Sequence, residues 1–424
     1  MIRLLQLSDI HWKDKLNDVD PFKHIREGLI EDIKRGIRQE GITYNSILIC
    51  GDIAFSGGEK EYEKATIFLK DLLDETGLTK EDVFVVPGNH DKNWFAHPQK
   101  FREFINSHIC EDKEHDEVLA NWLQTDMHSA SMMFTPYKEY DKFANEFGCS
   151  EMLMNRMNSE TLGINAAYMD GDDKMYWEDE LAKIGDYTIK IYGLNSGLYS
   201  DKYDYDDTEE RKDGHKMLLP KLAYNAAKRQ DGVVNIMMVH HPMPYIHEGD
   251  NLKMELDKLY DVQFYGHVHI ANSDNENNCI HVFSGALQPD EMNMGKNYRP
   301  VYNIVELDID NSNGDDYLTM NLQERYWNGS TFTEYRTAQH YSVKLPKYQW
   351  KGVNMIQTTN LPDGVTKHVV RVRLINNGKA RQIIETLSPG FYDESVPKYY
   401  NVMRFLEKVR QEGLWNKLWT EMEK

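Results

Sequence analysis

Five apolar segments of the chain are each followed closely by a residue of a type that can bind a metal ion. The segments are Ile2–Leu7, Ser46–Cys50, Val83–Val86, Val233–Val239 and Val262–Tyr265. Their lengths and apolar character are those of buried β-strands. Because parallel strands place their carboxyl ends at one edge of a sheet, the residues that follow these segments are expected to lie close together. This pattern constrains the fold more than any other feature of the chain.

The first three segments alternate with predicted helices. Residues 21–40 carry apolar side chains at helical spacing, and Asp20 can cap this helix. Residues 59–75 predict a second helix, which ends before Gly77. Alternation of strand and helix is typical of an α/β fold with its site at the carboxyl edge of the sheet.

Carboxylate, imidazole and amide side chains follow the first three segments. Asp9 and His11 are two residues apart, so in an extended chain their side chains point the same way and can converge on one ion. Asp52 follows Gly51, where the lack of a side chain lets other groups approach the backbone closely. The turn Gly88-Asn89-His90-Asp91 would leave an amide oxygen and an imidazole side by side. On its own, each motif could equally be a polar loop.

Histidines follow the remaining two segments, in the motifs His240-His241-Pro242 and Gly266-His267-Val268-His269. The candidate ligands are two carboxylates, one amide oxygen and four imidazoles: Asp9, His11, Asp52, Asn89, His240, His267 and His269. This mixture suits a pair of Mn, Fe or Zn ions and is poor for Ca or Mg alone. One such motif can arise by chance, whereas all five in this order, each after an apolar strand, indicate a metal site.

With these motifs, roughly residues 1–335 resemble the calcineurin-like metallophosphoesterase superfamily at every metal-ligand position. The resemblance implies a four-layer α/β/β/α sandwich and a site for two divalent or transition metal ions, with Mn favoured. It also implies how the ligands divide. Asp9, His11 and His269 would hold one ion, Asn89, His240 and His267 would hold the other, and Asp52 would bridge them.

The resemblance further implies hydrolysis of a phosphoester by attack of a metal-activated hydroxide on phosphorus. His90, held in place by Asp91, is our candidate for protonating or stabilising the leaving oxygen, and its alternative is a structural role beside the ligands. The family's His-x-Pro pattern selects His240 as the ligand. His241 would then lie behind the ligands or in the substrate pocket.

Net charge and cysteine use narrow the class of protein. The 424 residues carry a formal net charge of −20, which argues against a general nucleic-acid coat but not against a local basic groove. The four cysteines show no CxxC spacing, so neither a zinc knuckle nor a disulfide framework is indicated. The apolar N-terminus is too short for a signal peptide, and no apolar run is long enough for a membrane span, so we expect a cytoplasmic protein.

Two domains are expected. Residues 1–345 would form the catalytic domain, with a Met- and aromatic-rich helical insertion at about 92–185 that overhangs the site. Residues 346–424 would form a C-terminal accessory module, which has 13 Lys and Arg against 8 Asp and Glu. Residues 369–375 alternate like a strand with Arg371 and Arg373 on one face, and 402–419 form an amphipathic helix, so the module is predicted to be α+β. The pattern leaves open whether its basic face meets a polyanionic substrate or solvent.

A phosphodiesterase acting on a nucleotide or nucleic acid is the favoured function. The His-His-Pro segment resembles cyclic-nucleotide and glycerophosphodiester branches, and the basic module is similar to the capping domains of repair exonucleases. A phosphomonoesterase acting on a small metabolite or phosphoprotein is the alternative. The protein Ser/Thr phosphatase branch is disfavoured, since Gly51-Asp52 runs into Ile53-Ala54-Phe55 instead of Gly-Asp-x-x-Asp-Arg-Gly. A non-catalytic scaffold is disfavoured because no ligand is missing, and the sequence indicates no oligomeric state.

Overall fold

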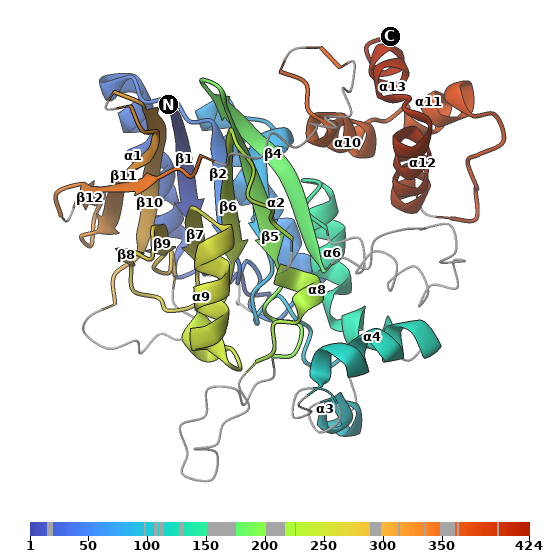
Figure 1. The fold of residues 1–424 in the computed structure, drawn as a ribbon, viewed down its shortest axis with the longest axis horizontal. Coiled ribbons are helices and arrows are strands. Elements are labelled where there is room, and N and C mark those ends of the chain that lie inside the picture. The colour runs from blue at the N-terminus through green and yellow to red at the C-terminus, as the bar shows by residue number, and fades with distance from the viewer. Residues whose placement is uncertain are drawn as a thin grey trace.

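The computed structural model describes most of the chain. The described residues are 1–14, 20–96, 99–105, 109, 114–126, 131–150, 175–200, 217–224, 226–288, 298–312, 314–334, 336–347, 361–362, 364–396 and 398–424. Two β-sheets lie at the centre, with helices around them and a group of C-terminal helices at one side (Figure 1).

The first sheet contains the three predicted N-terminal strands. Its order is β12-β11-β10-β1-β2-β3, and β13 pairs with β11 as a seventh strand. In chain order these strands are β1 (Ile2–Leu7), β2 (Ser46–Cys50), β3 (Val83–Val86), β10 (Val301–Asp310), β11 (Tyr317–Trp327), β12 (Phe332–Glu334) and β13 (Gln339–Lys344). β1, β2 and β3 are parallel, whereas β10 pairs antiparallel with β1. The carboxyl ends of β1, β2 and β3 therefore lie at the same edge of the sheet.

The second sheet contains the strands that precede the histidine motifs. Its order is β4-β5-β6-β7-β9-β8. In chain order these strands are β4 (Tyr176–Ile184), β5 (Tyr187–Leu194), β6 (Val233–Val239), β7 (Val262–Tyr265), β8 (Asn272–Glu276) and β9 (Cys279–Phe283). β5, β6, β7 and β9 are parallel. All residues of β2, β3 and β7 are buried, which explains why these strands have few polar positions.

Helices cover an outer face of each sheet. In α1 (Lys23–Glu40), the Asp32 carboxylate accepts the Tyr302 hydroxyl of β10 at 2.6 Å and Nε of Arg325 of β11 at 2.9 Å. In α9 (Gly249–Leu259), Oδ1 of Asp257 is 2.8 Å from Nε2 of His281 of β9. The remaining helices near the sheets are α2 (Glu59–Thr76), which packs on α1, and the short η1 (Lys80–Asp82), α8 (Lys221–Tyr224) and η6 (Met243–Tyr245). The predicted α/β class is confirmed.

One hydrophobic core joins the two sheets. It includes residues from Ile2 to Leu345. Where the edge strands β3 and β4 meet, Nε1 of Trp177 donates to Val85 O at 3.0 Å, and the Trp177 ring stacks on Phe84 with centroids 5.9 Å apart. On the other side, β13 contacts β8 and β9. The sheets are therefore held together at both sides, and their strand ends keep fixed positions relative to each other.

The region predicted as a helical insertion at 92–185 is helical only in part. Among its described residues the helices are α3 (Gln99–Ile105), α4 (His115–Thr125), η3 (Met132–Tyr137) and α6 (Lys138–Asn145), whereas residues 151–174 and shorter stretches between these helices lie outside the described part. The prediction is wrong at its end, because residues 176–184 form β4. A tight turn at Gly185, with φ of 57°, lets β4 pair antiparallel with β5, and this pairing determines the structure there.

The C-terminal residues form α10 (Lys367–Asn376), α11 (Ala380–Leu387), α12 (Lys398–Glu412) and α13 (Trp415–Met422). The predicted strand at residues 369–375 is wrong, because these residues lie in α10, and the described residues after 360 are helical with no strand, which differs from the predicted α+β character. Thr366 caps α10, since its side chain accepts the Val369 N–H at 3.2 Å. Val370 and Leu374 pack in the hydrophobic cluster of these helices, whereas the buried His368 faces β4. Because α10 is buried on two sides, its apolar residues alternate with polar ones in the way that is typical of a strand.

The basic face of α10 contacts the first 345 residues and is not free in solvent. Arg371 forms an ion pair with Asp179 of β4, and Nη2 of Arg373 is 3.3 Å from Oε2 of Glu81 of η1. Nδ1 of His368 is 2.9 Å from Oδ2 of Asp179. Burial by itself would raise the pKa of Asp179, but Arg371 and His368 hold it below its ordinary value. Since η1 precedes β3, this contact lies at the end of β3 opposite to the Asn89 turn.

The helices α10 to α13 enclose a hydrophobic cluster of their own, which includes Ile384, Phe405 and Leu418. This accords with a boundary between residues 345 and 346, which stays a prediction. Within the ranges given above, no helix is long and apolar enough to cross a membrane.

Candidate metal centre

The strand ends that carry the candidate ligands are joined to each other by hydrogen bonds. The His11 N–H donates to Asp52 O at 3.0 Å, which joins the loops after β1 and β2. Nδ1 of His240 donates to Cys50 O at 2.7 Å, and the Gly266 N–H donates to His240 O at 3.0 Å. The ends of β2, β6 and β7 are therefore linked across the two sheets.

Five of the seven candidate ligands have a left-handed backbone. Their φ angles are 51° for Asp9, 49° for His11, 52° for Asp52, 69° for His267 and 57° for His269. This conformation costs roughly 1–2 kcal/mol for a residue with a side chain. Such strain persists only where the surrounding structure determines it, and it clusters at functional sites.

Three glycines let the strand ends approach each other. A Cβ added at Gly88 would overlap the carboxylate of Asp52, and one added at Gly51 would overlap the ring of His240. A Cβ added at Gly266 would overlap the backbone of β2. Each motif therefore needs its glycine so that the neighbouring ligand can come close.

Asp9, His11 and His269 form a first group, whose ligand atoms lie within 4.8 Å of one another. Oδ1 of Asp9 is 3.1 Å from Nε2 of His269, and its Oδ2 accepts the His267 N–H at 3.1 Å. Burial by itself would raise the pKa of Asp9, but the hydrogen bond and charge of His269 lower it to about 2. The carboxylate is therefore ionised, as a metal ligand must be.

Asp52 lies between the two halves of the site. Its Oδ2 is 3.3 Å from Nε2 of His11 and 3.2 Å from Nε2 of His240, whereas its Oδ1 accepts the His90 N–H at 2.8 Å. Burial by itself would raise the pKa of Asp52, but the charges of His240 and His90 hold it well below its ordinary value. One buried carboxylate thus contacts a histidine from each sheet.

His240 and His267 lie on the other side of Asp52, with ring centroids 5.3 Å apart. His241 belongs to the same cluster, since the ligand atoms of His240, His241 and His267 lie within 4.8 Å of one another. Nε2 of His241 is 3.0 Å from Oδ1 of Asn89. The structure therefore brings all seven candidate ligands to one place and puts His241 among them.

The donor set fits divalent cations. Oδ1 of Asp9 and Nε2 of His240 are buried, and each faces another candidate ligand, His269 at 3.1 Å and Asp52 at 3.2 Å. Nδ1 of His11 donates to Gln288 O at 3.1 Å, and Nδ1 of His240 donates to Cys50 O. In the neutral form that binds a metal, each of these rings has its one hydrogen on Nδ1, so Nε2 of His11 and of His240 would offer a lone pair to the centre of the site.

His90 is held by Phe55 and not by Asp91. Its Nδ1 donates to Phe55 O at 2.8 Å, and its ring stacks on the Phe55 ring with centroids 5.1 Å apart. The ring is half-buried, and its centroid is 4.8 Å from that of His11. The prediction that Asp91 holds His90 is therefore wrong, whereas His90 does lie beside the candidate ligands.

Asp91 instead fastens the turn after β3 to the loop after β2. Its buried carboxylate accepts three backbone N–H groups, those of Ile53 (3.2 Å), Ala54 (2.8 Å) and Gly88 (2.9 Å). The Tyr62 hydroxyl of α2 donates to it at 3.0 Å. Burial and the charge of Asp52 raise the pKa of Asp91 to about 7, although the backbone hydrogen bonds oppose this. Asp91 therefore shapes the turn and does not touch the ring that it was expected to hold.

Three residues that hold histidines of the site were not predicted. Gln288 O accepts Nδ1 of His11, Phe55 O accepts Nδ1 of His90, and the Ser196 hydroxyl is 2.8 Å from Nδ1 of His241. Ser196 follows the apolar strand β5, so the pattern that identified the other strand ends also marks it. Phe55 and Gln288 act on these rings through backbone carbonyls, which every residue has, so no sequence signal marks them.

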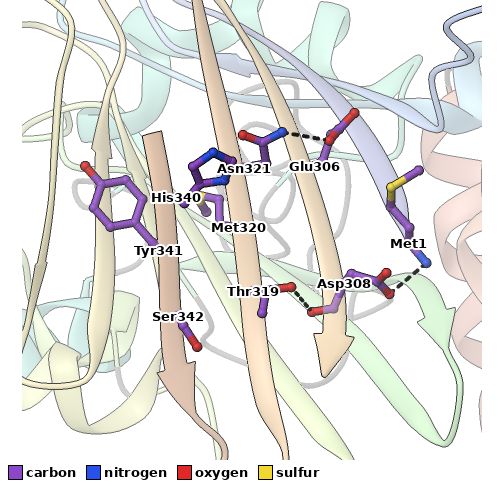
Figure 2. Close-up of a pocket in the computed structure, with 9 residues that line it drawn as sticks. All are labelled: Met1, Glu306, Asp308, Thr319, Met320, Asn321, His340, Tyr341 and Ser342. Carbon is purple, nitrogen blue, oxygen red and sulfur yellow. Dashed lines mark hydrogen bonds and ion pairs between the residues drawn. The ribbon is translucent and has the colours of Figure 1, made fainter. Parts of the chain in front are cut away.

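A shallow groove of about 420 Å³ lies elsewhere, on the first sheet beside β10, β11 and β13 (Figure 2). Its Glu306 accepts hydrogen bonds from Arg3 at 2.9 Å and Asn321 at 3.0 Å, and its Asp308 pairs with the amino group of Met1 at 3.0 Å. None of the seven candidate ligands lines this groove. Its acidic groups are already paired, and it is not part of the candidate site.

Comparison with known proteins identifies a family for the chain. The family model for calcineurin-like phosphoesterases matches residues 2–271. The uncharacterized metallophosphoesterase-like protein YydB of Bacillus subtilis (strain 168) is 24% identical over 335 residues, which are 77% of this chain and 61% of that protein. The chain thus spans about three fifths of the length of this relative.

Solved structures give more distant similarities. GAP50 of Plasmodium, described as the anchor in the inner membrane complex, has a TM-score of 0.39 at 13% identity, covering 82% of this chain and 90% of that one. Wild-type Vps29 of Entamoeba histolytica, described as complexed with zinc, has a TM-score of 0.31 at 11% identity, covering 81% of this chain and all of that one.

Proposed function

The chain belongs to the calcineurin-like phosphoesterase family, and we propose that it is a dinuclear metal-dependent phosphodiesterase acting on a nucleotide. The position of Asp52 carries the proposal. Its buried carboxylate is 3.3 Å from Nε2 of His11 and 3.2 Å from Nε2 of His240, so it can be shared by one ligand group on each side. Asp9 and His269 complete one group, and the other is Asn89, His240 and His267.

The cations and the residues around the centre would have separate roles in hydrolysis. Two divalent cations, when bound, supply positive charge for the phosphoryl oxygens and lower the pKa of a water molecule. The Nδ1 contacts of His11 and His240 with backbone carbonyls keep both Nε2 atoms directed inward. His90, half-buried and fixed by Phe55, would give a proton to the leaving oxygen. Lys13 lies 4.0 Å from the centroid of the Phe55 ring and adds positive charge for an anionic substrate.

A small diester is favoured over a nucleic-acid polymer. The net charge of −20 opposes binding of a long polyanion. Arg371 and Arg373, the residues expected to form a basic face for such a substrate, are paired with Asp179 and Glu81. The basic face of the C-terminal module, which supported a nuclease, is therefore explained by ion pairs within the chain.

The proposal is tested by comparing hydrolysis of bis-p-nitrophenyl phosphate and p-nitrophenyl phosphate in Mn²⁺, with and without a chelator. Cyclic nucleotides and single- and double-stranded DNA follow as substrates. We expect the diester to be preferred, the chelator to abolish turnover, and nucleotides to be cleaved faster than DNA. Preference for the monoester would replace the proposal by a phosphomonoesterase. Absence of both turnover and bound metal would indicate a non-catalytic scaffold.

A further inference from the structure

A sixth strand end, that of β5, is fastened to the turn that carries Asn89 and His90. The buried ammonium of Lys92 donates to Leu198 O and to Ser200 O, both at 2.7 Å. The segment of residues 195–200 thus lies against the turn after β3. None of the family-like motifs includes this segment, so its role needs a separate explanation.

Ser196 in this segment contacts His241 twice, and both residues are completely buried. Its Oγ accepts the His241 backbone N–H at 3.1 Å and lies 2.8 Å from Nδ1 of the same residue. A hydroxyl has two lone pairs and one hydrogen, so Oγ can accept the backbone N–H and donate its own hydrogen to Nδ1. When Oγ donates in this way, Nδ1 of His241 is the acceptor of the pair.

This arrangement determines where the His241 ring carries its hydrogen. A neutral imidazole has one N–H and one acceptor nitrogen, so an accepting Nδ1 requires the hydrogen on Nε2. Nε2 lies 3.0 Å from the side chain of Asn89 and donates to its Oδ1. The two ends of an amide have nearly the same shape, and a donor at this position selects the oxygen. An amide oxygen has two lone pairs, so Oδ1 keeps one for another partner.

We propose that Ser196 is a positioning residue which, through His241, fixes the Asn89 amide so that its oxygen serves as a metal ligand. The inference rests on the metal centre of the proposed function and adds two groups to it that do not bind metal themselves. Partners that fix the orientation of ligands typically change metal affinity by about 10- to 100-fold when removed. The competing possibility is that Nε2 of His241 itself binds an ion, since it lies in the cluster of His240 and His267.

The hydrogen position is measured first, in metal-free protein with nitrogen-15 histidine. Two-dimensional nitrogen–proton NMR separates the tautomer protonated at Nε2 from the one protonated at Nδ1, and the signals of His241 are identified by their loss in His241→Gln. We expect the Nε2–H tautomer. The Nδ1–H tautomer would overturn the proposal. This measurement needs no Ser196 variant and does not depend on any enzymatic activity.

Metal affinity is measured next, by calorimetric titration of metal-free protein with Mn²⁺. Ser196→Ala should weaken one of two binding steps by about 10- to 100-fold and leave the other unchanged. Ser196→Thr, which keeps a hydroxyl, should restore most of that loss. The matched control is Ser200→Ala, which removes another buried hydroxyl of the same segment, one that donates to Gly197 O at 2.6 Å.

The outcomes separate this inference from the proposed function. Wild-type affinity in Ser196→Ala, or equal weakening in Ser200→Ala, would overturn the positioning role. So would a loaded protein in which His241 shows direct metal ligation. If instead Ser196→Ala weakens one step as expected and no phosphoester is cleaved, the positioning role stands and only the proposed reaction fails.

Discussion

Replacing His281 by Asn should destabilise the fold by about 3 kcal/mol at neutral pH, with a loss that becomes smaller in alkali. His281 is fully buried on β9 between two carboxylates: Nε2 is 2.8 Å from Oδ1 of Asp257, and Nδ1 is 2.6 Å from Oδ1 of Asp274. Burial by itself would lower the pKa of His281, but the hydrogen bonds with Asp257 and Asp274 raise it to about 11. The ring is therefore a cation that donates from both nitrogens.

The magnitude follows from these two contacts. A hydrogen bond to a charged group contributes roughly 1.5–3 kcal/mol. Asp274 is 45% exposed, so solvent screens its contact, whereas Asp257 is only 1% exposed. Asp257 keeps Lys253 at 3.0 Å and Asn277 at 2.9 Å after the substitution, so it is not left unpaired. The loss should therefore lie at the lower end of the roughly 3–5 kcal/mol found when one partner of a buried pair is removed.

The pH dependence has a definite sign. Because the pKa of His281 is raised from 6.5 to about 11 in the folded state, its stabilisation is complete below pH 6.5 and is lost as the pH rises towards 11. The difference between wild type and His281→Asn should shrink by at most about 1.4 kcal/mol per pH unit in that window. On the acid side, burial opposes but the His281 hydrogen bond lowers the pKa of Asp257 to about 2, so its contribution is present above pH 3.8 and is lost towards pH 2.

Urea unfolding followed by tryptophan fluorescence, with a chelator present, measures the free energy of unfolding at pH 6.5 and pH 9.5. The control is His340→Asn, which changes an exposed histidine on β13 and should stay within about 0.5 kcal/mol of wild type. A loss below about 1 kcal/mol in His281→Asn, or the same loss at both pH values, would refute the reasoning.

Three further substitutions test other parts of the chain. Asp52→Asn should lower bound Mn²⁺ below that of wild type and abolish turnover, whereas His90→Ala should abolish turnover with metal retained. Elemental analysis and diester hydrolysis measure both, and loss of metal in His90→Ala would make His90 a ligand or structural residue. Arg371→Ala removes the ion pair with Asp179 and should cost about 2 kcal/mol in urea unfolding without changing turnover. A fall in turnover would instead connect the C-terminal helices to the reaction.

The strand ends could be predicted because the strands before them are buried on both faces. Such strands appear in the sequence as apolar runs, and a polar residue soon after the run is easily seen, as with Asp52, which follows β2 and Gly51. Parallel order then brings these ends together without any knowledge of side-chain contacts. Ser196 follows the same rule after β5, but its neighbours gave no reason to assign it a role.

Other features depend on contacts that a linear pattern does not contain. Asp91 adjoins His90 in sequence, yet the turn points its carboxylate at the backbone of the preceding loop, and Phe55 O takes the imidazole. In α10, His368 faces β4 while Val370 faces the other C-terminal helices, so burial on two sides gave a helix the alternation of a strand. β4 was missed because its partner, β5, determines its conformation.

The pairing of β1 with β10 has a consequence for synthesis of the chain. Ile2 pairs with Leu307, so one edge of the first strand has no partner until some three hundred further residues have been made. At roughly 5–20 residues per second, that interval is on the order of 15–60 s. An unpaired apolar strand edge invites association with other chains. A nascent chain that ended just after His269 would contain every candidate ligand and would still expose this edge of β1. The edge of the strand that leads to Asp9 and His11 is therefore paired only after β10 has been synthesised.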